Sequence, residues 1–421
     1  MAKHGLTRRD FMAGSAALGA TAMMPNFAFA EAKETMKVGL IGCGGRGRDA
    51  AINCIDSSEG VEIVAIGDAF ADHLQQGVDT LKQYRPKNLT APKEQLFVGL
   101  DAYEKVLQCD VDLVILTTPP AFRAQHLTAA INAGKHVFME KPVAVDGEGI
   151  LQVFDAADLA KKKGLAIVAG TQRRHEDSYR ETMKRIHDGA IGDVVSMRAY
   201  WNQGGLWNVN RTPEMSDLEW QMRNWLYFTW LSGDHIVEQH IHNIDVCLWA
   251  CQKTPLSAVA LGGREVRTSP AFGHIFDHFA VEFDMGDDVK IHSYCRQQDG
   301  TAGNVSEFVV GTKGKSNPNG RIMGENAYRY DAENKENPYM VEHRDLIASI
   351  RSGNPLNEGR QVAESVLAAI MGRLAAYTGQ VVTREQALKT KGLVPKEYHW
   401  DMSLSVPEPC HPGRTKIEDF M

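Results

Sequence analysis

The chain of 421 residues carries 53 acidic and 46 basic side chains, and its formal net charge of −7 argues against a nucleic-acid partner. Its composition, 43% hydrophobic and 24% charged, is that of a globular enzyme long enough for two domains. Beyond the first 30 residues no apolar run is long enough to cross a bilayer, so we expect no membrane span.

Residues 1–30 have the pattern of an export signal. A positively charged region precedes a mild apolar segment, and Ala-Phe-Ala at 28–30 is a small-x-small cleavage site. The run T-R-R-D-F at 7–11 resembles the twin-arginine (Tat) signal, which implies export of the already folded protein to the periplasm. An ordinary secretory signal is the alternative. We expect the mature chain to begin near Glu31.

A short apolar strand, predicted over 38–41, runs directly into a glycine-rich turn. Gly42, Gly44 and Gly47 have the spacing G-x-G-x-x-G, in which the glycines allow a tight turn, a close approach to pyrophosphate and close helix packing. The helix predicted over 46–55 would point its first N–H groups at the phosphates. We add Gly45 and Arg46, from the same turn, to the predicted cofactor site.

The acidic residue that a dinucleotide site needs follows the next strand. The strand predicted over 61–67 ends at Asp68, 21 residues after Gly47. A carboxylate there accepts hydrogen bonds from the ribose hydroxyls of NAD and repels the 2′-phosphate of NADP. The sequence therefore predicts NAD as the cofactor. NADP is the alternative, because Arg46 offers a charge to a phosphate.

Strands and helices alternate up to about residue 170, which is typical of a doubly wound parallel sheet. A buried strand predicted over 111–116 ends in Thr117, Thr118 and Pro119. Ligands of such sheets bind at the carboxyl ends of strands, so we expect this turn to border the nicotinamide side of the cofactor. His126, in the following helix, is also placed with the cofactor-binding residues.

The second informative motif is Glu140-Lys141-Pro142, at the end of a strand predicted over 135–139. A lysine there lies over the crevice, where its ammonium group can hydrogen-bond a substrate hydroxyl and stabilise developing alkoxide charge. We assign Glu140 to the cofactor and Lys141 to both cofactor and catalysis, and we hypothesise that the Lys141–Pro142 bond is cis.

Polar side chains follow the last strand of the first domain, predicted over 166–170. We expect Gln172 to contact the cofactor and Arg173 to contact the substrate. The next stretch, 202–232, is rich in aromatic residues, which suit stacking against sugar rings. We select Trp201, Trp225 and Tyr227 as substrate-binding residues. The alternative is a long loop packed by its own aromatic side chains.

A helix predicted over 233–249 places Glu238, His242 and Asp245 at i, i+4 and i+7, on one face. A carboxylate and an imidazole one turn apart can transfer a proton, with the carboxylate orienting the ring. We predict His242 as the base, helped by Glu238 or Asp245. The three histidines of this stretch do not share a helical face, so no metal site is predicted.

The remainder predicts an antiparallel sheet and two closing helices. Strand candidates joined by hairpin turns lie at 256–266, 278–283, 289–295 and 306–311. Two amphipathic helices are predicted over 340–352 and 360–377. From residue 386 the tail is rich in proline, and we expect it to wrap a neighbouring subunit. The seven cysteines have no metal-like spacing, and their pairing is left open.

These motifs together resemble the Gfo/Idh/MocA oxidoreductases, which act on sugars, polyols and related molecules. The resemblance spans about 36–380 and rests on the glycine motif, on A-G-K-H-V at 133–137 running into Glu140-Lys141-Pro142, and on an acid-x-x-x-His motif. It implies an N-terminal Rossmann domain followed by an α+β domain with a mostly antiparallel open sheet, which often mediates homo-oligomers. It also implies that Lys141 lies near the reacting carbon. The family usually has Asp where this chain has Glu238.

We therefore predict a Rossmann domain over 36–170, a substrate and oligomerisation domain over 171–385, and a tail over 386–421. The predicted function is hydride transfer between a secondary alcohol of a sugar, glycoside or polyol and a tightly bound NAD. Free NAD is scarce outside the cytoplasm, so an exported dehydrogenase needs a retained cofactor. The alternatives are an NAD-assisted glycosidase or lyase without net redox change, and a nucleotide-bound protein without catalysis.

Overall fold

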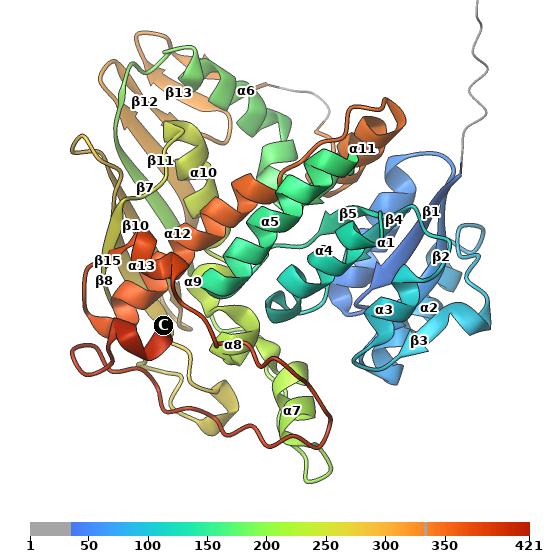
Figure 1. Ribbon diagram of the computed structural model, residues 1–421. Coiled ribbons are helices and arrows are strands. Elements are labelled where there is room, and N and C mark those ends of the chain that lie inside the picture. Colours follow the sequence, from blue (N-terminus) through green and yellow to red (C-terminus); the bar gives the residue numbers. More distant parts are fainter. Residues whose placement is uncertain (1–34, 332–334) are drawn as a thin grey trace, which may run out of the picture. The chain divides into compact units, whose positions relative to one another are not determined.

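The computed structural model describes residues 35–331 and 335–421, and the predicted export signal at 1–30 lies outside them (Figure 1). This part of the chain forms two β-sheets, one of six and one of nine strands. Within the described ranges no helix combines the length and apolar character needed to cross a lipid bilayer.

The six-stranded sheet is parallel throughout and confirms the predicted Rossmann domain. Its order is β3-β2-β1-β4-β5-β6, so the chain winds outwards in both directions from β1 and β4. The carboxyl ends of β1 and β4 therefore flank the switch point at which such sheets bind ligands. The strands are β1 (Met36–Ile41), β2 (Val61–Asp68), β3 (Leu96–Val98), β4 (Leu113–Leu116), β5 (His136–Met139) and β6 (Ile167–Ala169).

Helices cover both faces of this sheet, because its strands are apolar on both sides. On one face Cys54, Leu81 and Ile347 are among the buried contacts, and on the other Leu127 and Ile150. The first face is covered by α1 (Gly45–Ser57), α2 (Ala71–Tyr84) and α11 (Pro338–Arg351), the second by α3 (Ala102–Leu107), α4 (Arg123–Asn132) and α5 (Gly147–Lys163). Since α11 comes late in the sequence, the chain returns to the first domain to complete its core.

The nine-stranded sheet is mostly antiparallel, as predicted for the second domain. Its order is β14-β13-β12-β11-β7-β10-β9-β8-β15, and β7 with β10 is the parallel pair among its described strands. The strands are β7 (Val194–Gln203), β8 (Ser257–Gly263), β9 (His278–Asp284), β10 (Lys290–Gln297), β11 (Asn304–Gly311), β12 (Gly314–Asn317), β13 (Arg321–Gly324), β14 (Tyr328–Arg329) and β15 (Val382–Thr383).

A long buried helix, α12 (Gly359–Thr378), joins the two domains. It packs against β8 and β9 on one side and against α5 of the first domain on the other (Figure 1). Leu367 and Ile370 on this helix are fully enclosed. α10 (Ile241–Cys251) covers β7 and β11 beside it, and α6 (Asp177–His187) and α13 (Arg384–Leu388) complete this layer. The packing makes one continuous apolar core across both domains.

The single helix predicted over 233–249 is wrong. The structure has α9 (His235–Glu238) and α10, separated by a turn at Gln239 and His240. These two side chains bond to the sheet instead: His240 Nε2 lies 2.7 Å from Ser293 Oγ, and Gln239 accepts from Gln297 Nε2. Tertiary hydrogen bonds thus override the helical pattern at this point.

The aromatic stretch and the tail both pack within the chain, which for the aromatic stretch is the alternative given above. Residues 202–232 contain α7 (Asp217–Arg223) and α8 (Thr229–Ser232), and most of their aromatic side chains are buried. The tail lies against its own chain: Val394, Tyr398 and Leu404 join an apolar cluster with Phe122 and Trp230. In Figure 1 the red tail runs alongside α8 and α7. Apolar side chains in the tail account for this intramolecular packing.

Candidate functional site

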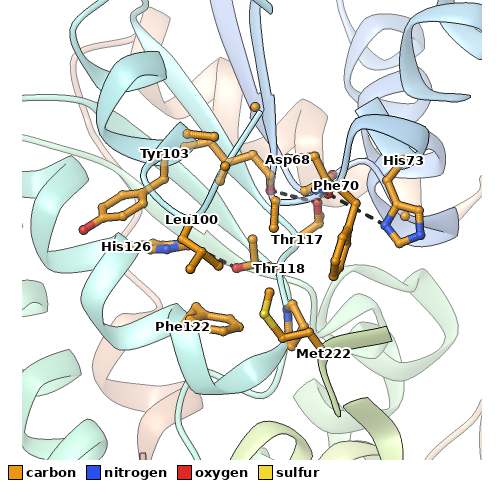
Figure 2. A pocket seen from close by; sticks show the side chains of 18 of the residues that line it. Asp68, Phe70, His73, Leu100, Tyr103, Thr117, Thr118, Phe122, His126 and Met222 are labelled. Carbon is orange, nitrogen blue, oxygen red and sulfur yellow. Dashed lines mark hydrogen bonds and ion pairs between the residues drawn. The ribbon is translucent and has the colours of Figure 1, made fainter. Parts of the chain in front are cut away.

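Two cavities lie along the carboxyl ends of β2, β1, β4 and β5. The first, here called the glycine cavity, is lined by Gly42, Gly44, Asp68, Tyr103 and His126 among others (Figure 2). The second, the lysine cavity, is lined mainly by polar and charged side chains, namely Arg46, Arg123, Glu140, Lys141, Gln172, Glu238, His242, Asn337 and Tyr339 with several neighbours. The cavities adjoin, because Thr117, Thr118 and Trp225 line both.

The glycine turn after β1 has the geometry that a pyrophosphate requires. Gly42 has φ +97°, and a Cβ there would lie 2.8 Å from the Thr117 backbone. A Cβ on Gly47 would lie 2.0 Å from the Gly42 carbonyl oxygen, whereas one on Gly44 or Gly45 would meet nothing within 4 Å. No described side chain caps the first turn of α1. The turn therefore leaves open space beside free helical N–H groups, as an anion site needs.

Asp68, at the end of β2, is buried and oriented by the backbone. Its carboxylate accepts from Cys43 N at 2.6 Å and from Phe70 N at 2.8 Å, which leaves further lone pairs for ribose hydroxyls. Among the described residues no arginine or lysine lines the glycine cavity. Arg46, considered above for a 2′-phosphate, lies in the lysine cavity, where its Nε donates to Glu140 at 2.5 Å. This charge arrangement fits NAD rather than NADP.

The turn after β4 is hydrogen-bonded to the glycine turn. Thr117 Oγ1 donates to the Gly42 carbonyl oxygen at 2.7 Å, and Thr118 Oγ1 lies 3.2 Å from His126 Nδ1. The His126 ring stacks on Tyr103 at 4.1 Å between centroids. Burial lowers the pKa of His126 to about 3, so its ring is neutral. The structure thus brings these residues and Pro119 together in the glycine cavity.

Lys141 lies in the lysine cavity at the end of β5, and the Lys141–Pro142 bond is cis, as hypothesised. Its ammonium group donates to the Glu238 carbonyl oxygen at 2.6 Å and to Glu238 Oε1 at 2.9 Å. An ammonium group has three donors, so one remains for a ligand oxygen. The contact joins the first domain to the end of α9 in the second.

His242, in the first turn of α10, lines the same cavity. Its ring stacks on Trp201 at 5.8 Å between centroids, and the residue is 8% exposed. Burial lowers its pKa well below the usual value, and the nearby cations, Lys141 first, lower it further. A neutral imidazole beside an ammonium group can accept a proton from an alcohol hydroxyl.

A second carboxylate system supports the floor of the lysine cavity. Glu140 is buried, and a Cβ on Gly170 would lie 2.4 Å from its carboxylate, so any larger residue at position 170 would displace that carboxylate. Arg46 bridges Glu140 to Glu342 of α11, and its guanidinium carbon lies 4.6 Å from the Tyr339 ring centroid. These contacts fix Arg46 beside the cavity and explain why α11 packs on α1.

Several lining residues escaped the sequence analysis. Asn337, the N-cap of α11, and Tyr339 in its first turn line the lysine cavity, and Met222 lines the glycine cavity from α7. They are distant in sequence from every motif, so no spacing rule marks them. Arg123 could have been predicted as a site residue, because it lies shortly after the Thr-Thr-Pro-Pro turn at 117–120. Its Nη2 donates to the Thr118 carbonyl oxygen, and burial lowers its pKa to about 10.

Other predicted site residues lie outside both cavities. Asp245 accepts from Arg174 twice at 2.8 Å and from Ser365 Oγ at 2.7 Å, so it is held in a buried ion pair. Tyr227 is fully buried, with its hydroxyl donating to the Trp207 carbonyl oxygen at 2.8 Å.

Arg173 and Trp201 stand just behind the lysine cavity. Arg173 pairs with Glu307, and its guanidinium carbon lies 5.7 Å from the Trp201 ring centroid. Trp201 in turn stacks on His242, and its Nε1 donates to Gln203 at 2.7 Å. Of the four predicted substrate-binding residues, Trp225 is the one that lines the cavities.

The described residues hold no group of three or more His, Cys, Asp or Glu side chains that could bind a metal ion. All seven cysteines fall within the described ranges, and each is a free thiol there. The polar groups that line the two cavities are ammonium, guanidinium, imidazole, carboxylate, amide and hydroxyl groups. Together with the open glycine turn and Asp68, this set fits a dinucleotide next to an alcohol.

Comparison with known protein families matches both halves of the chain. Residues 36–171 match the oxidoreductase family with an NAD-binding Rossmann fold, and residues 179–317 match the GFO/IDH/MocA C-terminal domain. These two matches together cover more than half of the chain. The first identifies the glycine cavity as part of an NAD-binding Rossmann domain.

Curated relatives and solved structures agree with this. The inositol 2-dehydrogenase of Klebsiella pneumoniae strain 342 is 29% identical over 216 residues, covering 51% of this chain and 54% of that protein. Inositol 2-dehydrogenase 3 of Saccharopolyspora erythraea is 28% identical over 62% of this chain and 68% of that protein. The chain thus spans about half the length of the first relative.

Among solved structures, scyllo-inositol dehydrogenase from Lactobacillus casei with bound NAD(H) and scyllo-inositol superimposes with a TM-score of 0.63. The identity is 21%, and the match covers 84% of this chain and 100% of that chain. An oxidoreductase from Thermotoga maritima gives a TM-score of 0.65 at 21% identity, with the same coverage. At these identities the likeness establishes the fold.

Two glycine substitutions in the turn after β1 should have different effects. Gly44→Ala should preserve the free energy of unfolding but weaken NAD binding about tenfold or more, because its methyl group enters the open space beside the turn. Gly47→Ala should destabilise the fold, because its methyl group meets the Gly42 carbonyl oxygen. Thermal unfolding and NAD titration separate the two effects. Equal NAD affinity in Gly44→Ala and wild type would contradict this assignment.

The imidazole of His242 should titrate well below pH 6.5. Histidine-labelled NMR, with His242→Gln to assign the resonance, measures this pKa directly. Because the pKa is lowered, the neutral base persists as the pH falls below 6.5 and is lost only when the pH passes the lowered value. Lys141→Met should raise the pKa of His242, because it removes the positive charge that lowers this pKa most. A His242 pKa at or above 6.5 would show that the ring is not held neutral.

Proposed function

The chain belongs to the Gfo/Idh/MocA family of oxidoreductases, and on that premise we propose that it transfers a hydride between a secondary alcohol of a polyol or sugar and NAD. The observation that carries the proposal is the meeting of Lys141, Glu238 and His242 in one cavity beside the NAD-binding turn. Alcohol oxidation needs a proton acceptor and a group that stabilises negative charge at the reacting oxygen, and a neutral imidazole and an ammonium donor can supply these.

The roles of the three side chains follow from their contacts. Glu238 holds the Lys141 ammonium group through two hydrogen bonds and leaves one N–H for the substrate oxygen. As the hydroxyl loses its proton, this N–H stabilises the developing negative charge. His242, kept neutral by burial and by Lys141, takes the proton. Glu238 therefore acts mainly by positioning Lys141, where the family usually uses the shorter aspartate.

The cofactor would be held by residues of the glycine cavity. The N–H groups at the start of α1 would bind the pyrophosphate and Asp68 would accept hydrogen bonds from the ribose hydroxyls. Thr118, which lines both cavities, and Gln172 of the lysine cavity would border the nicotinamide half. Bound NAD supplies the hydride acceptor, and reduced NAD the donor.

The substrate class is supported by two independent features. The curated relatives are inositol 2-dehydrogenases, which act on a cyclic polyol as their names state. The lysine cavity carries amide and hydroxyl groups from Gln172, Asn337 and Tyr339, with the Trp225 ring beside them. Such groups hydrogen-bond several hydroxyls while the aromatic face packs on a ring. We therefore propose a cyclic polyol or a sugar as substrate.

We also propose that residues 1–30 are a Tat signal and that the folded protein works in the periplasm. The basic pair Arg8 and Arg9, the apolar segment and the Ala-Phe-Ala site support this. Tat transport carries folded proteins, so NAD bound in the cytoplasm can travel with the chain. The cofactor would then stay bound and be regenerated in place by a second substrate or an electron acceptor.

A homo-oligomer built on the outer face of the nine-stranded sheet is part of the proposal. This face is opposite to the one that α10 and α12 cover. A cross-strand row of Leu261, Ala280, Tyr294 and Tyr200 lies on it, and Leu261 is 78% exposed. Exposed apolar patches on otherwise polar surfaces mark protein contacts.

The hydride-transfer proposal is tested with the NAD-loaded protein and a panel of inositols, sugars and glycosides. We expect absorbance of reduced nicotinamide to appear in amounts equal to bound NAD and to persist without an acceptor. Disappearance of a glycoside with no lasting reduction would favour the NAD-assisted glycosidase instead. Absence of both signals across the panel would contradict an alcohol dehydrogenase.

Two substitutions separate catalysis from structure. His242→Gln should lower kcat by about 10²–10⁴-fold while the protein remains folded and NAD-bound, because it removes the base. Asp245→Asn should retain kcat at low temperature but lose about 2 kcal/mol of stability, because it weakens the buried pair with Arg174. Single-turnover kinetics and thermal unfolding measure the two effects. Equal loss of kcat in both variants would mean that Asp245 belongs to the proton-transfer system.

Leu261→Glu should reduce the molar mass in light scattering, because a carboxylate is then buried in the sheet interface. Leu151→Glu is a matched control, since Leu151 is 47% exposed on α5 of the first domain. A monomeric wild type, or an unchanged oligomer in Leu261→Glu, would contradict the interface.

A further inference from the structure

Two segments distant in sequence meet over the glycine cavity. The first is 217–231, which contains α7 and α8, and the second is 393–404 of the tail; together they are here called the strap. Polar contacts join them: Gln221 Nε2 donates to the Leu404 carbonyl oxygen at 2.9 Å, and Leu404 N donates to Asp217 at 3.0 Å. Trp230 Nε1 donates to Gln221 Oε1 at 2.7 Å and holds that amide in place.

The strap is fastened to the first domain at the edge of the same cavity. The Arg223 guanidinium group donates to both carboxylate oxygens of Asp72, at 3.0 and 3.1 Å, and its carbon lies 4.0 Å from the Phe70 ring centroid. From the tail, the Trp400 ring lies 5.4 Å from Phe70, and Tyr398 lies 5.2 Å from Phe122. Phe70 and Phe122 themselves line the glycine cavity.

The inner side of the strap reaches the cavity itself. Met222 and Trp225 line it together with Asp68 and Gly44 of the Rossmann domain. Figure 2 shows Met222 on the strap, facing the space between Phe70, Phe122 and Thr118. A Rossmann sheet alone offers only an open crevice to its nucleotide. Here the strap lies along that crevice, and a buried apolar cluster that includes Trp220, Trp230 and Leu231 stabilises it.

We propose that the strap is part of the cofactor site and keeps NAD bound over many turnovers. Met222 would pack against the adenosine half, since a thioether suits the face of a purine, and Trp225 would contact the cofactor where the two cavities join. Release then requires the strap to separate from Phe70 and Phe122, with loss of the Arg223–Asp72 pair. This inference rests on the proposed NAD-dependent function and supplies a physical basis for a cofactor that is regenerated in place.

The arrangement also explains why the aromatic stretch lies where it does. Sugar stacking would require the rings to face the lysine cavity, but Trp220, Phe228 and Trp230 are buried in the apolar cluster inside the strap. Their packing area stabilises the closed cover instead. Trp225 stands at the junction of the two cavities, so it can contact both the cofactor and the substrate side.

The test measures the rate of NADH release, followed by nicotinamide fluorescence after mixing the NADH-loaded full chain with excess NAD. Arg223→Gln and Trp400→Ala should each raise this rate about tenfold or more, because contact losses in a formed complex appear mainly in dissociation. Met222→Ala should also raise the release rate, while leaving the Arg223–Asp72 pair and the Trp400–Phe70 contact intact. None of these measurements depends on turnover of a substrate.

Arg360→Gln is the matched control. Arg360 also pairs with an aspartate, Asp158 at 3.1 Å, and lies over a phenylalanine ring, Phe154 at 4.5 Å, but it joins α12 to α5 away from both cavities. Its release rate should equal that of wild type. Thermal unfolding of every variant verifies that the fold persists.

The outcomes separate the strap from the function. Fast release in the three strap variants and slow release in wild type and Arg360→Gln would support the strap. Slow release in all variants would overturn it and leave NAD binding intact. Fast release already in wild type would overturn it as well. A wild type that binds no NADH at all would overturn both the strap and the proposed function.

Discussion

The contact on which the site depends is the hydrogen-bonded pair of Lys141 and Glu238. Lys141 stands at the end of a strand of the first domain, and Glu238 at the end of a helix of the second. Because the ammonium group bonds both the carbonyl and the carboxylate of Glu238, this contact links the two domains at the lysine cavity. His242, in the first turn of α10, lines the same cavity.

The position of Glu238 is itself imposed by a buried network at the other end of α9. Asp234 precedes this helix with φ 70°, an unfavourable conformation for a residue with a side chain. Its enclosed carboxylate accepts from the backbone of His235 and Phe276 and from the Tyr377 hydroxyl. These bonds tie α9 to the segment that precedes β9 and to α12, and so compensate the strain. Helix α12, packed on both domains, thereby sets the reach of Glu238 towards Lys141.

The two cavities differ in charge and polarity, and each therefore suits a different ligand group. The glycine cavity combines apolar walls with a single buried carboxylate, Asp68, which suits a nucleoside. The lysine cavity gathers cations, and these together with burial keep His242 neutral, which suits a base acting beside an ammonium group. Arg46 sits at the boundary, paired with Glu140 and Glu342.

The sequence alone determined the fold class and the NAD turn, because glycine spacing and strand-end motifs encode local backbone geometry. Its predicted catalytic residues Lys141, Glu238 and His242 line one cavity in the structure, and their roles stay a prediction. Tertiary structure decided what local patterns do not encode. It broke the predicted helix at Gln239 and His240 through hydrogen bonds to the sheet, and it placed Asp245 in a buried ion pair. It also turned the aromatic stretch and the tail into a cover for the glycine cavity. These outcomes depend on contacts between segments far apart in the sequence, such as Gln221 with Leu404, 183 residues later, and no periodicity within either segment predicts such a contact.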